Sequence, residues 1–153
     1  MTPAAEALVI DACVAVKWHV HDEDHVAQAT LLLTRFAQGS VDLLAPDHIQ
    51  PEFTAAITKA TRGRKPRLTQ SQGSDAIDEF LSLGLRTFET APLLQPAYSL
   101  THEFGCAFYD ALYLALAQRL SLSLVTADGK FYRAARRHPA LIWIGDYAPS
   151  TQL

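Results

Sequence analysis

Short apolar runs alternate with amphipathic segments along the chain, and this alternation constrains the fold more than any other feature. The apolar runs are expected to be strands: residues 7–10, 43–45, 85–88, 122–126 and 141–144. Helical spacing of apolar residues predicts helices over 22–38, 48–62, 70–83, 93–104 and 110–120, a short helix or turn within 12–20, and a short basic helix opened by Asp128. Strands that alternate with helices predict an α/β fold with a central, mainly parallel sheet flanked by helices.

The length of 153 residues corresponds to one domain, which we expect to cover residues 1–153. Apolar residues make up 49% of the chain and charged residues 19%, and this balance is typical of an ordered globule. No apolar run reaches the roughly 18 residues that a membrane span needs. The first residues lack the basic region and apolar core of a signal peptide. We therefore expect a cytoplasmic protein without a membrane partner.

Acidic residues stand near the ends of the predicted strands. Asp11 directly follows the first strand, and Asp128 follows the fourth strand by two residues. Glu52 lies early in the helix after the second strand, and Asp110 opens the apolar helix before the fourth. Because parallel sheets bind ligands at the carboxyl ends of their strands, we expect these four carboxylates to converge there. Taken singly, each aspartate is also explained as a helix N-cap, as is Asp47 before the helix 48–62, and Glu52 as a surface acid.

Four carboxylates at close range repel one another, and their burial raises their pKa values. A hard divalent cation such as Mg²⁺ or Mn²⁺ removes this conflict, because it prefers oxygen ligands and keeps several of its waters. A metal-activated water can then attack phosphorus in an in-line displacement. The pattern therefore predicts that Asp11, Glu52, Asp110 and Asp128 are both metal ligands and catalytic residues.

Basic residues gather in two short segments, although the net charge of the chain is −3. Five of the thirteen lie within residues 59–67 and four more within 130–137. An acidic cluster repels phosphate, so basic side chains must bring a phosphate-bearing substrate to it. The candidates for substrate binding are Arg62, Arg64, Lys65 and Arg67. A solubilising loop explains the same segment, and Lys17 is either close to the site or an ordinary surface lysine.

Four segments carry a resemblance to a known family: LVIDACVAVKW (8–18), APDHIQPEF (45–53), FYDALYLALAQRL (108–120) and LVTADGKF (124–131). In this order they resemble the PIN domain, and more narrowly the VapC-type toxins of bacterial toxin–antitoxin pairs. The resemblance spans residues 8 to about 146. The family's acids match Asp11, Glu52, Asp110 and Asp128, and Thr126 matches a hydroxyl residue that the family often places beside the metal.

This resemblance implies a PIN-like fold and cleavage of RNA by a Mg²⁺- or Mn²⁺-dependent endoribonuclease. It also implies a homodimer and inhibition by a cognate VapB-like antitoxin, which we expect to lay an apolar helix into a groove. The chain departs from the family at two positions. Ala55 stands where the family often has Asn, and Cys13 stands where it often has Ser or Asn. Neither departure removes one of the four acids.

Two other functions remain open from the residues. A phosphatase or receiver domain also gathers aspartates at strand ends, but a phosphatase needs D-x-D after the first strand, and Cys13 stands at the second position. A receiver needs paired acids there and a lysine after the last strand, and neither is seen. The second alternative is a PIN-fold module that binds RNA or an antitoxin without turnover, although the complete acid set argues against lost activity.

The remaining chemistry-bearing residues have structural explanations. His19, His21 and His25 lie close together, and the last two have the i, i+4 spacing of a zinc pair, but the acids 22–24 between them indicate a solvated helix start. We expect Cys13 and Cys106 to be small buried apolar residues. Core or dimer packing is expected for most of the aromatic residues, with base stacking as the alternative: Trp18, Phe108, Tyr109, Tyr113 and Tyr132.

Overall fold

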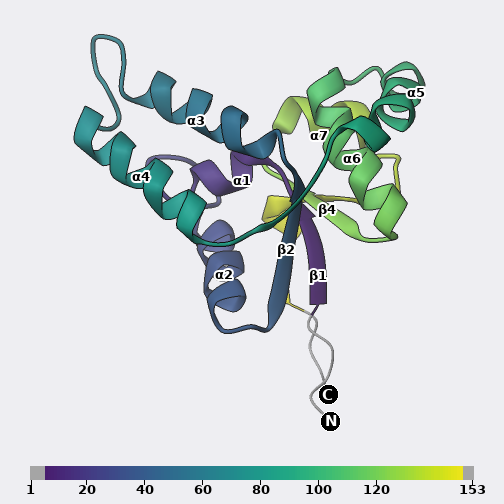
Figure 1. Ribbon diagram of the computed structural model, residues 1–153, viewed down its shortest axis with the longest axis horizontal. Coiled ribbons are helices and arrows are strands. Elements are labelled where there is room, and N and C mark those ends of the chain that lie inside the picture. The colour runs from purple at the N-terminus through teal and green to yellow at the C-terminus, as the bar shows by residue number, and fades with distance from the viewer. Residues whose placement is uncertain (1–5, 150–153) are drawn as a thin grey trace.

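The computed structural model describes residues 6–149, which form a five-stranded parallel sheet with helices on both faces (Figure 1). The strands are β1 (Glu6–Ile10), β2 (Val41–Pro46), β3 (Arg86–Phe88), β4 (Ser123–Thr126) and β5 (Leu141–Trp143). Their order is β3-β2-β1-β4-β5, and every neighbouring pair is parallel. The predicted α/β class and parallel sheet are therefore confirmed.

Helices follow the strands in the predicted order. They are α1 (Ala12–Val16), α2 (Val26–Ala37), α3 (Ile49–Ala60), α4 (Gln70–Ser82), α5 (Leu94–Phe104), α6 (Phe108–Leu120) and α7 (Gly129–Ala135), with short 3-10 turns η1 (Ala91–Leu93) and η2 (Ile144–Asp146). The main differences from the prediction lie at helix starts. The helix predicted over 22–38 begins only at Val26, and the helix predicted from Asp110 begins at Phe108.

Local signals explain where several helices begin and end. Thr69 caps α4 in a reciprocal capping box with Gln72, which satisfies two backbone N–H groups of its first turn. Gly105 ends α5 in the left-handed region, where its lack of a Cβ avoids strain. The prediction of Asp47 as the cap of α3 is wrong, because His48 occupies the N-cap position and makes no side-chain capping bond.

Helix α6 is the central element of the core. Seven consecutive residues, 111–117, are buried, which confirms the prediction of a helix apolar on nearly every face. This helix packs against β1, β2 and β4 on one side and against α5 on the other. Its first turn therefore has a fixed position relative to the strand ends.

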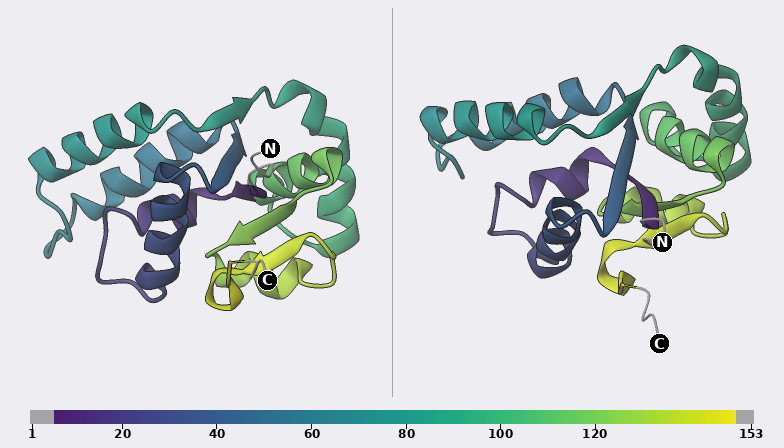
Figure 2. Two further views of the ribbon diagram at one scale, coloured as in Figure 1. Left: turned by 90° about the horizontal axis from the view of Figure 1, so that it is seen from below. Right: turned by 60° about the horizontal axis from the view of Figure 1, so that its bottom comes forward.

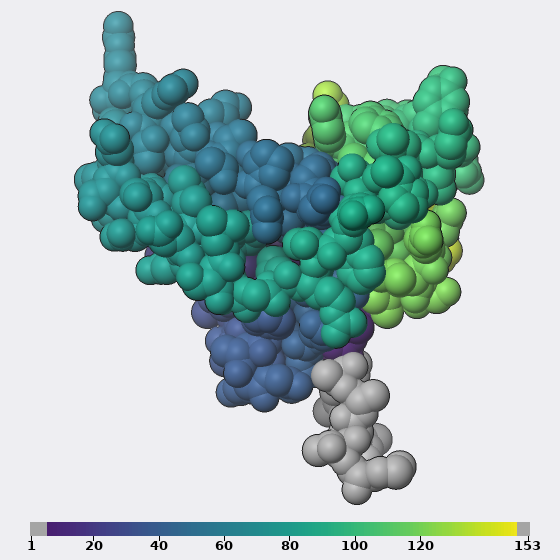
Figure 3. All heavy atoms as spheres, in the orientation of Figure 1, coloured from purple at the N-terminus to yellow at the C-terminus, as the bar shows by residue number. Residues whose placement is uncertain are grey.

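Helices α3 and α4 run side by side away from the sheet (Figure 2). The rings of Phe53 and Phe80 stack between them with centroids 4.2 Å apart, and α3 also packs against α1. In the space-filling view the surface is hollowed between α3 and the group formed by α5, α6 and α7 (Figure 3). Within residues 6–149, no helix combines the length and apolar character needed to cross a membrane.

Candidate functional site

Asp11 and Thr126 meet where the central strands β1 and β4 end. Asp11 follows β1 and caps α1, with its Oδ1 accepting the N–H of Val14 at 3.1 Å. Thr126 is the last residue of β4 and donates its hydroxyl hydrogen to Asp11 Oδ2. The hydroxyl oxygen accepts the backbone N–H of Asp128 at 3.0 Å. Because Asp11 and Thr126 are both buried, this pair fixes a carboxylate inside the protein.

The other acids come from three different helix starts. Asp128 caps α7, with its Oδ1 accepting the N–H of Phe131 at 3.2 Å. Asp110 lies in the first turn of α6, and Glu52 lies in the first turn of α3. The N-cap explanation of Asp110 is wrong, because α6 begins two residues earlier and its cap position is Ala107. Asp110 therefore has no capping role that would account for a half-buried acid at this place.

The carboxylates of the cluster influence one another electrostatically. Burial raises the pKa of Asp11 from 3.8 to about 7, against the hydrogen bonds that it accepts, and the charge of Asp110 raises it further. Burial also raises the pKa of Asp110 to about 6, and the charges of Asp128 and Glu52 add to this rise. We call Asp11, Glu52, Asp110 and Asp128 the acidic cluster.

Cys13 lies among these carboxylates. Desolvation raises the pKa of its thiol, and the charges of all four members of the acidic cluster raise it further. The prediction that Cys13 is a buried apolar residue is wrong, because part of its surface is exposed to solvent, and Cys106 is only half-buried. The thiol, in the first turn of α1, is close enough to the acidic cluster for the charge of each carboxylate to affect it.

The donor set of the acidic cluster fits a hard divalent cation in its chemistry. Glu52 Oε1 is buried, and no group within residues 6–149 donates a hydrogen bond to it. Such an oxygen is costly to bury unless a positive partner is present. In the same part of the chain, however, no three His, Cys, Asp or Glu side chains already stand as a set able to hold a metal ion. The carboxylates are neighbours, but not a ready-made coordination sphere.

His48 belongs to this site and was missed by the sequence reasoning. Its Nε2 lies 2.9 Å from Glu52 Oε1 and 3.1 Å from the backbone oxygen of Tyr109. Its charge lowers the pKa of Asp110, against the larger effects of burial and of the neighbouring acids. The i, i+4 spacing of His48 and Glu52 was the only signal in the sequence.

The basic segment divides into free and paired side chains. Arg62, Arg64 and Lys65 are exposed in the loop between α3 and α4. Arg67 instead forms ion pairs with Asp22 at 2.6 Å and Glu23 at 2.7 Å, and these hydrogen bonds raise its pKa. Lys17 is neither a free surface lysine nor unpaired, because it is buried and contacts Glu23 at 3.1 Å.

Lys59 is a basic residue that lies in a hollow beside Cys13. It lines a hollow of about 340 Å³ together with Cys13, Ala56 and Ala127. Arg67 and Glu23 form another part of the same wall. None of the four acids lines this hollow, and Cys13, whose pKa their charges raise, is the wall residue that relates it to the acidic cluster.

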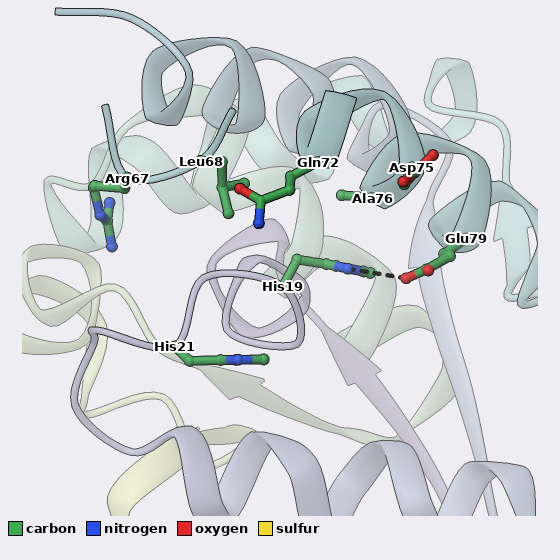
Figure 4. Close-up of a pocket in the computed structure, with 8 residues that line it drawn as sticks. All are labelled: His19, His21, Arg67, Leu68, Gln72, Asp75, Ala76 and Glu79. Carbon is green, nitrogen blue, oxygen red and sulfur yellow. Dashed lines mark ion pairs between the residues drawn. The ribbon is translucent and has the colours of Figure 1, made fainter. Parts of the chain in front are cut away.

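A second hollow, of about 440 Å³, lies between α4 and the segment after α1 (Figure 4). None of the four acids lines it. His19 faces Glu79 across it at 3.4 Å, whereas His21 contacts the backbone oxygen of Trp18. The predicted solvated surface is confirmed for His21, Asp22 and Asp24, which are exposed. The helix start was misplaced, because residues 22–24 precede α2, and His25 packs edge-on against Trp143.

The aromatic residues separate into core and surface. Trp18 and Tyr113 are buried, as the packing prediction expects. Phe108 and Tyr109 are exposed in the first turn of α6, directly before Asp110, although Tyr109 also contacts the ring of His48. Tyr132 is partly buried against Trp143.

Comparison with known proteins places this geometry in a family. The sequence model described as PIN domain matches residues 8–137. Ribonuclease VapC12 of Mycobacterium tuberculosis is 34% identical over 86 residues, which are 56% of this chain and 64% of that protein. The match thus spans under two thirds of the relative's length.

Solved structures share the fold at low sequence identity. A protein of Pyrobaculum aerophilum matches with a TM-score of 0.64 and 22% identity, over 93% of this chain and 85% of that chain. A toxin–antitoxin complex from Klebsiella pneumoniae matches with a TM-score of 0.61 and 15% identity, over 88% of this chain and 95% of that chain. The family match covers most of the chain and agrees with the parallel sheet and the strand-end acids: the chain belongs to the PIN domain family.

Proposed function

We propose that this protein is an endoribonuclease that depends on a divalent cation, Mg²⁺ or Mn²⁺. The observation that carries the proposal is the buried Asp11 carboxylate, which Thr126 holds at the end of β1 while it also binds the backbone of Asp128. Burial and neighbouring carboxylates raise the pKa of Asp11 to about 7 and of Asp110 to about 6, and such perturbed groups mark functional sites. The similarity to ribonuclease VapC12 supports RNA as the substrate.

Asp11, Glu52, Asp110 and Asp128 would hold the cation. When bound, the cation offsets their mutual repulsion and supplies Lewis-acid chemistry for hydrolysis of a phosphodiester. Thr126 keeps the Asp11 carboxylate in place through its hydroxyl. Asp11 and Asp128 each use one oxygen for a helix cap, so their orientation is set by backbone N–H groups before any cation binds.

Basic side chains would bind the phosphates of the RNA. Arg62, Arg64 and Lys65 extend from the loop between α3 and α4, and Arg67 and Lys59 line the hollow next to Cys13. We propose Arg62, Arg64, Lys65 and Arg67 as substrate-binding residues, together with Lys59. Their contacts with phosphates would set the affinity for RNA and its salt dependence, but they would not distinguish one base sequence from another.

The experiment is cleavage of RNA by the purified chain with Mg²⁺ or Mn²⁺ and with a chelator. Asp110→Asn keeps the size of the side chain but removes its charge, so cleavage should fall at least about a hundredfold while the fold is retained. The matched control is Asp78→Asn, which changes an exposed acid on α4. Cleavage by Asp110→Asn at the wild-type rate, or wild-type cleavage in the chelator, would reject the proposal.

We further propose that the protein is a VapC-type toxin with a VapB-like antitoxin partner and that it forms a homodimer. The antitoxin partner is supported by the fold that this chain shares with the toxin–antitoxin complex from Klebsiella pneumoniae. Exposed Leu94 and Tyr98 on α5 offer an apolar surface for a second protein chain. Co-purification of a small DNA-binding protein, and growth arrest by the toxin alone, test this role. A chain that purifies alone and leaves growth unchanged would contradict it.

A further inference from the structure

Unpartnered polar atoms concentrate around Glu52. Within residues 6–149, the buried side-chain atoms without a hydrogen-bond partner are His48 Nδ1, Glu52 Oε1, Tyr113 Oη and His19 Nε2. The first three belong to side chains at one place, since His48 contacts Glu52 and its ring packs against Tyr113 at 4.5 Å. Natural proteins leave few such atoms unsatisfied, and clusters of them call for a functional explanation.

The imidazole of His48 bridges two elements of the site. Its Nε2 lies between two acceptors, the backbone oxygen of Tyr109 at 3.1 Å and Glu52 Oε1 at 2.9 Å. Because neither neighbour can donate, Nε2 must carry a hydrogen. The side chain of His48 is only 10% exposed, and the ring contacts both Tyr109 and Tyr113. Packing therefore holds the donor in one orientation.

The hydrogen on Nε2 is directed toward Tyr109 rather than toward Glu52. The contact with Tyr109 has hydrogen-bond geometry, whereas Glu52 Oε1 lies close to Nε2 without it. Glu52 is thus attracted to the polarised N–H, yet its oxygen keeps its lone pairs for another ligand. This arrangement orients a carboxylate without saturating it.

We propose that His48 is a positioning residue that ties the Glu52 carboxylate of α3 to the first turn of α6, beside Asp110. The tie is direct, because Tyr109 immediately precedes Asp110 in the chain. Glu52 and Asp110 repel each other, and a free glutamate side chain at the start of α3 would turn toward solvent. His48 counteracts this tendency. The inference rests on the proposed metal-dependent cleavage and assigns a further residue to it.

Two substitutions at His48 distinguish the role of its hydrogen-bond donor from that of its ring packing. His48→Gln places an amide nitrogen near the position of Nε2 and keeps a donor for Tyr109. His48→Phe keeps a ring against Tyr113 but removes the donor. The matched control is His102→Phe, which changes an exposed histidine on α5 whose ring contacts Tyr98. Each variant is tested for RNA cleavage, for binding of Mn²⁺ alone by calorimetry, and for thermal unfolding.

We expect His48→Phe to remain folded, to lose about 10–100-fold in kcat with a smaller change in KM, and to weaken Mn²⁺ binding by a similar factor. His48→Gln should recover most of both properties, and His102→Phe should match the wild type. Wild-type kcat and Mn²⁺ affinity in His48→Phe would overturn the assignment. Equal losses in folded His48→Gln and His48→Phe would also overturn it, since the donor would then be irrelevant.

A second comparison covers the case in which His48→Phe does not fold. His48→Asn carries its amide near the position of Nδ1 instead of Nε2. It should therefore lose activity that His48→Gln retains. Equal activity of the two variants would overturn the proposal. Mn²⁺ binding also separates the two hypotheses. If the wild type binds Mn²⁺ but cleaves no RNA, the proposed function fails, while the Mn²⁺ affinities of the variants still decide the role of His48.

Discussion

Thr126 donates its hydroxyl hydrogen to Asp11 Oδ2, although the two residues lie 115 positions apart in the sequence. The contact exists because β1 and β4 are neighbours and Ile10 is paired with Val125 in the sheet register. Asp11, which follows Ile10, therefore lies beside Thr126, which follows Val125. The hydroxyl oxygen also accepts the N–H of Asp128, so one side chain orders two members of the acidic cluster.

Thr126→Val should lower both stability and cleavage. Valine keeps the shape of the side chain but leaves buried Asp11 Oδ2 without its donor and the N–H of Asp128 without its acceptor. The expected loss in the free energy of unfolding is about 1–3 kcal/mol, measured by urea denaturation in a chelator. Thr126→Ser retains the hydroxyl and should stay closer to the wild type. A valine variant as stable and as active as the serine variant would contradict this account.

The metal-free protein should lose stability as the pH rises from 5 to 8. The pKa values of Asp11 and Asp110, about 7 and about 6, lie above the ordinary 3.8, so the folded state keeps protons that the unfolded chain has released. Their contribution to stability is complete below about pH 3.8 and disappears as the pH passes through 6 and then 7. Unfolding in denaturant with a chelator at several pH values measures this change.

Asp110→Asn should reduce this pH dependence. At pH 8 the variant should be more stable than the metal-free wild type by about 1–2 kcal/mol, after allowance for the partial exposure of the carboxylate. The difference should shrink at pH 5, while Asp78→Asn should show no such pattern. Addition of Mn²⁺ at pH 8 should reverse the order, because the cation binds the folded wild type. A metal-free Asp110→Asn variant that is less stable than the wild type at pH 8 would refute the repulsion argument.

Basic residues should differ in their effect on RNA binding according to their pairing. In an Asp110→Asn background, Arg64→Gln or Lys59→Gln should reduce the slope of log affinity against log salt by about 0.7 for each RNA phosphate that the variant no longer neutralises. Arg67→Gln should change the slope less, because Arg67 is already paired with Asp22 and Glu23. Fluorescence anisotropy with single-stranded RNA over a salt series measures the slopes. Unchanged slopes for both Lys59 and Arg64 would remove these residues from the substrate path.

Phe53 should be essential for holding α3 against α4. Its ring is fully buried and stacks on Phe80, so Phe53→Ala should cost about 3–5 kcal/mol of unfolding free energy. Leu81→Ala is the control, since Leu81 follows Phe80 on α4 but is 54% exposed and should change stability by less than about 0.5 kcal/mol. Urea denaturation compares the two, and similar costs would contradict the packing described for this helix pair.

The sequence predicted the strand-end acids well because their position follows from chain order. A strand that ends directly before Asp11 and another that ends two residues before Asp128 deliver those side chains to the same edge in any parallel sheet. Glu52 and Asp110 were predicted less directly, since an acid in the first turn of a helix is common on surfaces, and the family resemblance strengthened their assignment. Electrostatic coupling among the acids is a property of the fold and is visible only in space.

The missed features depend on contacts between distant segments. His48 becomes part of the site through the backbone oxygen of Tyr109, 61 positions away. Arg67 is paired with Asp22 and Glu23, which come from the loop before α2, and no local pattern indicates that pairing. Helix starts were misplaced for a related reason. His25 adopts a left-handed conformation just before α2, which a periodicity of apolar residues does not reveal.

The position of β1 between β2 and β4 has a consequence for synthesis of the chain. Asp11 emerges from the ribosome early, but its hydroxyl partner Thr126 and the last acid, Asp128, emerge only after most of the chain has been made. Until β4 adds to the open edge of β1, a nascent chain carries an incomplete set of carboxylates. A growing polypeptide with this strand order therefore cannot assemble the proposed cation site until its final strands have docked.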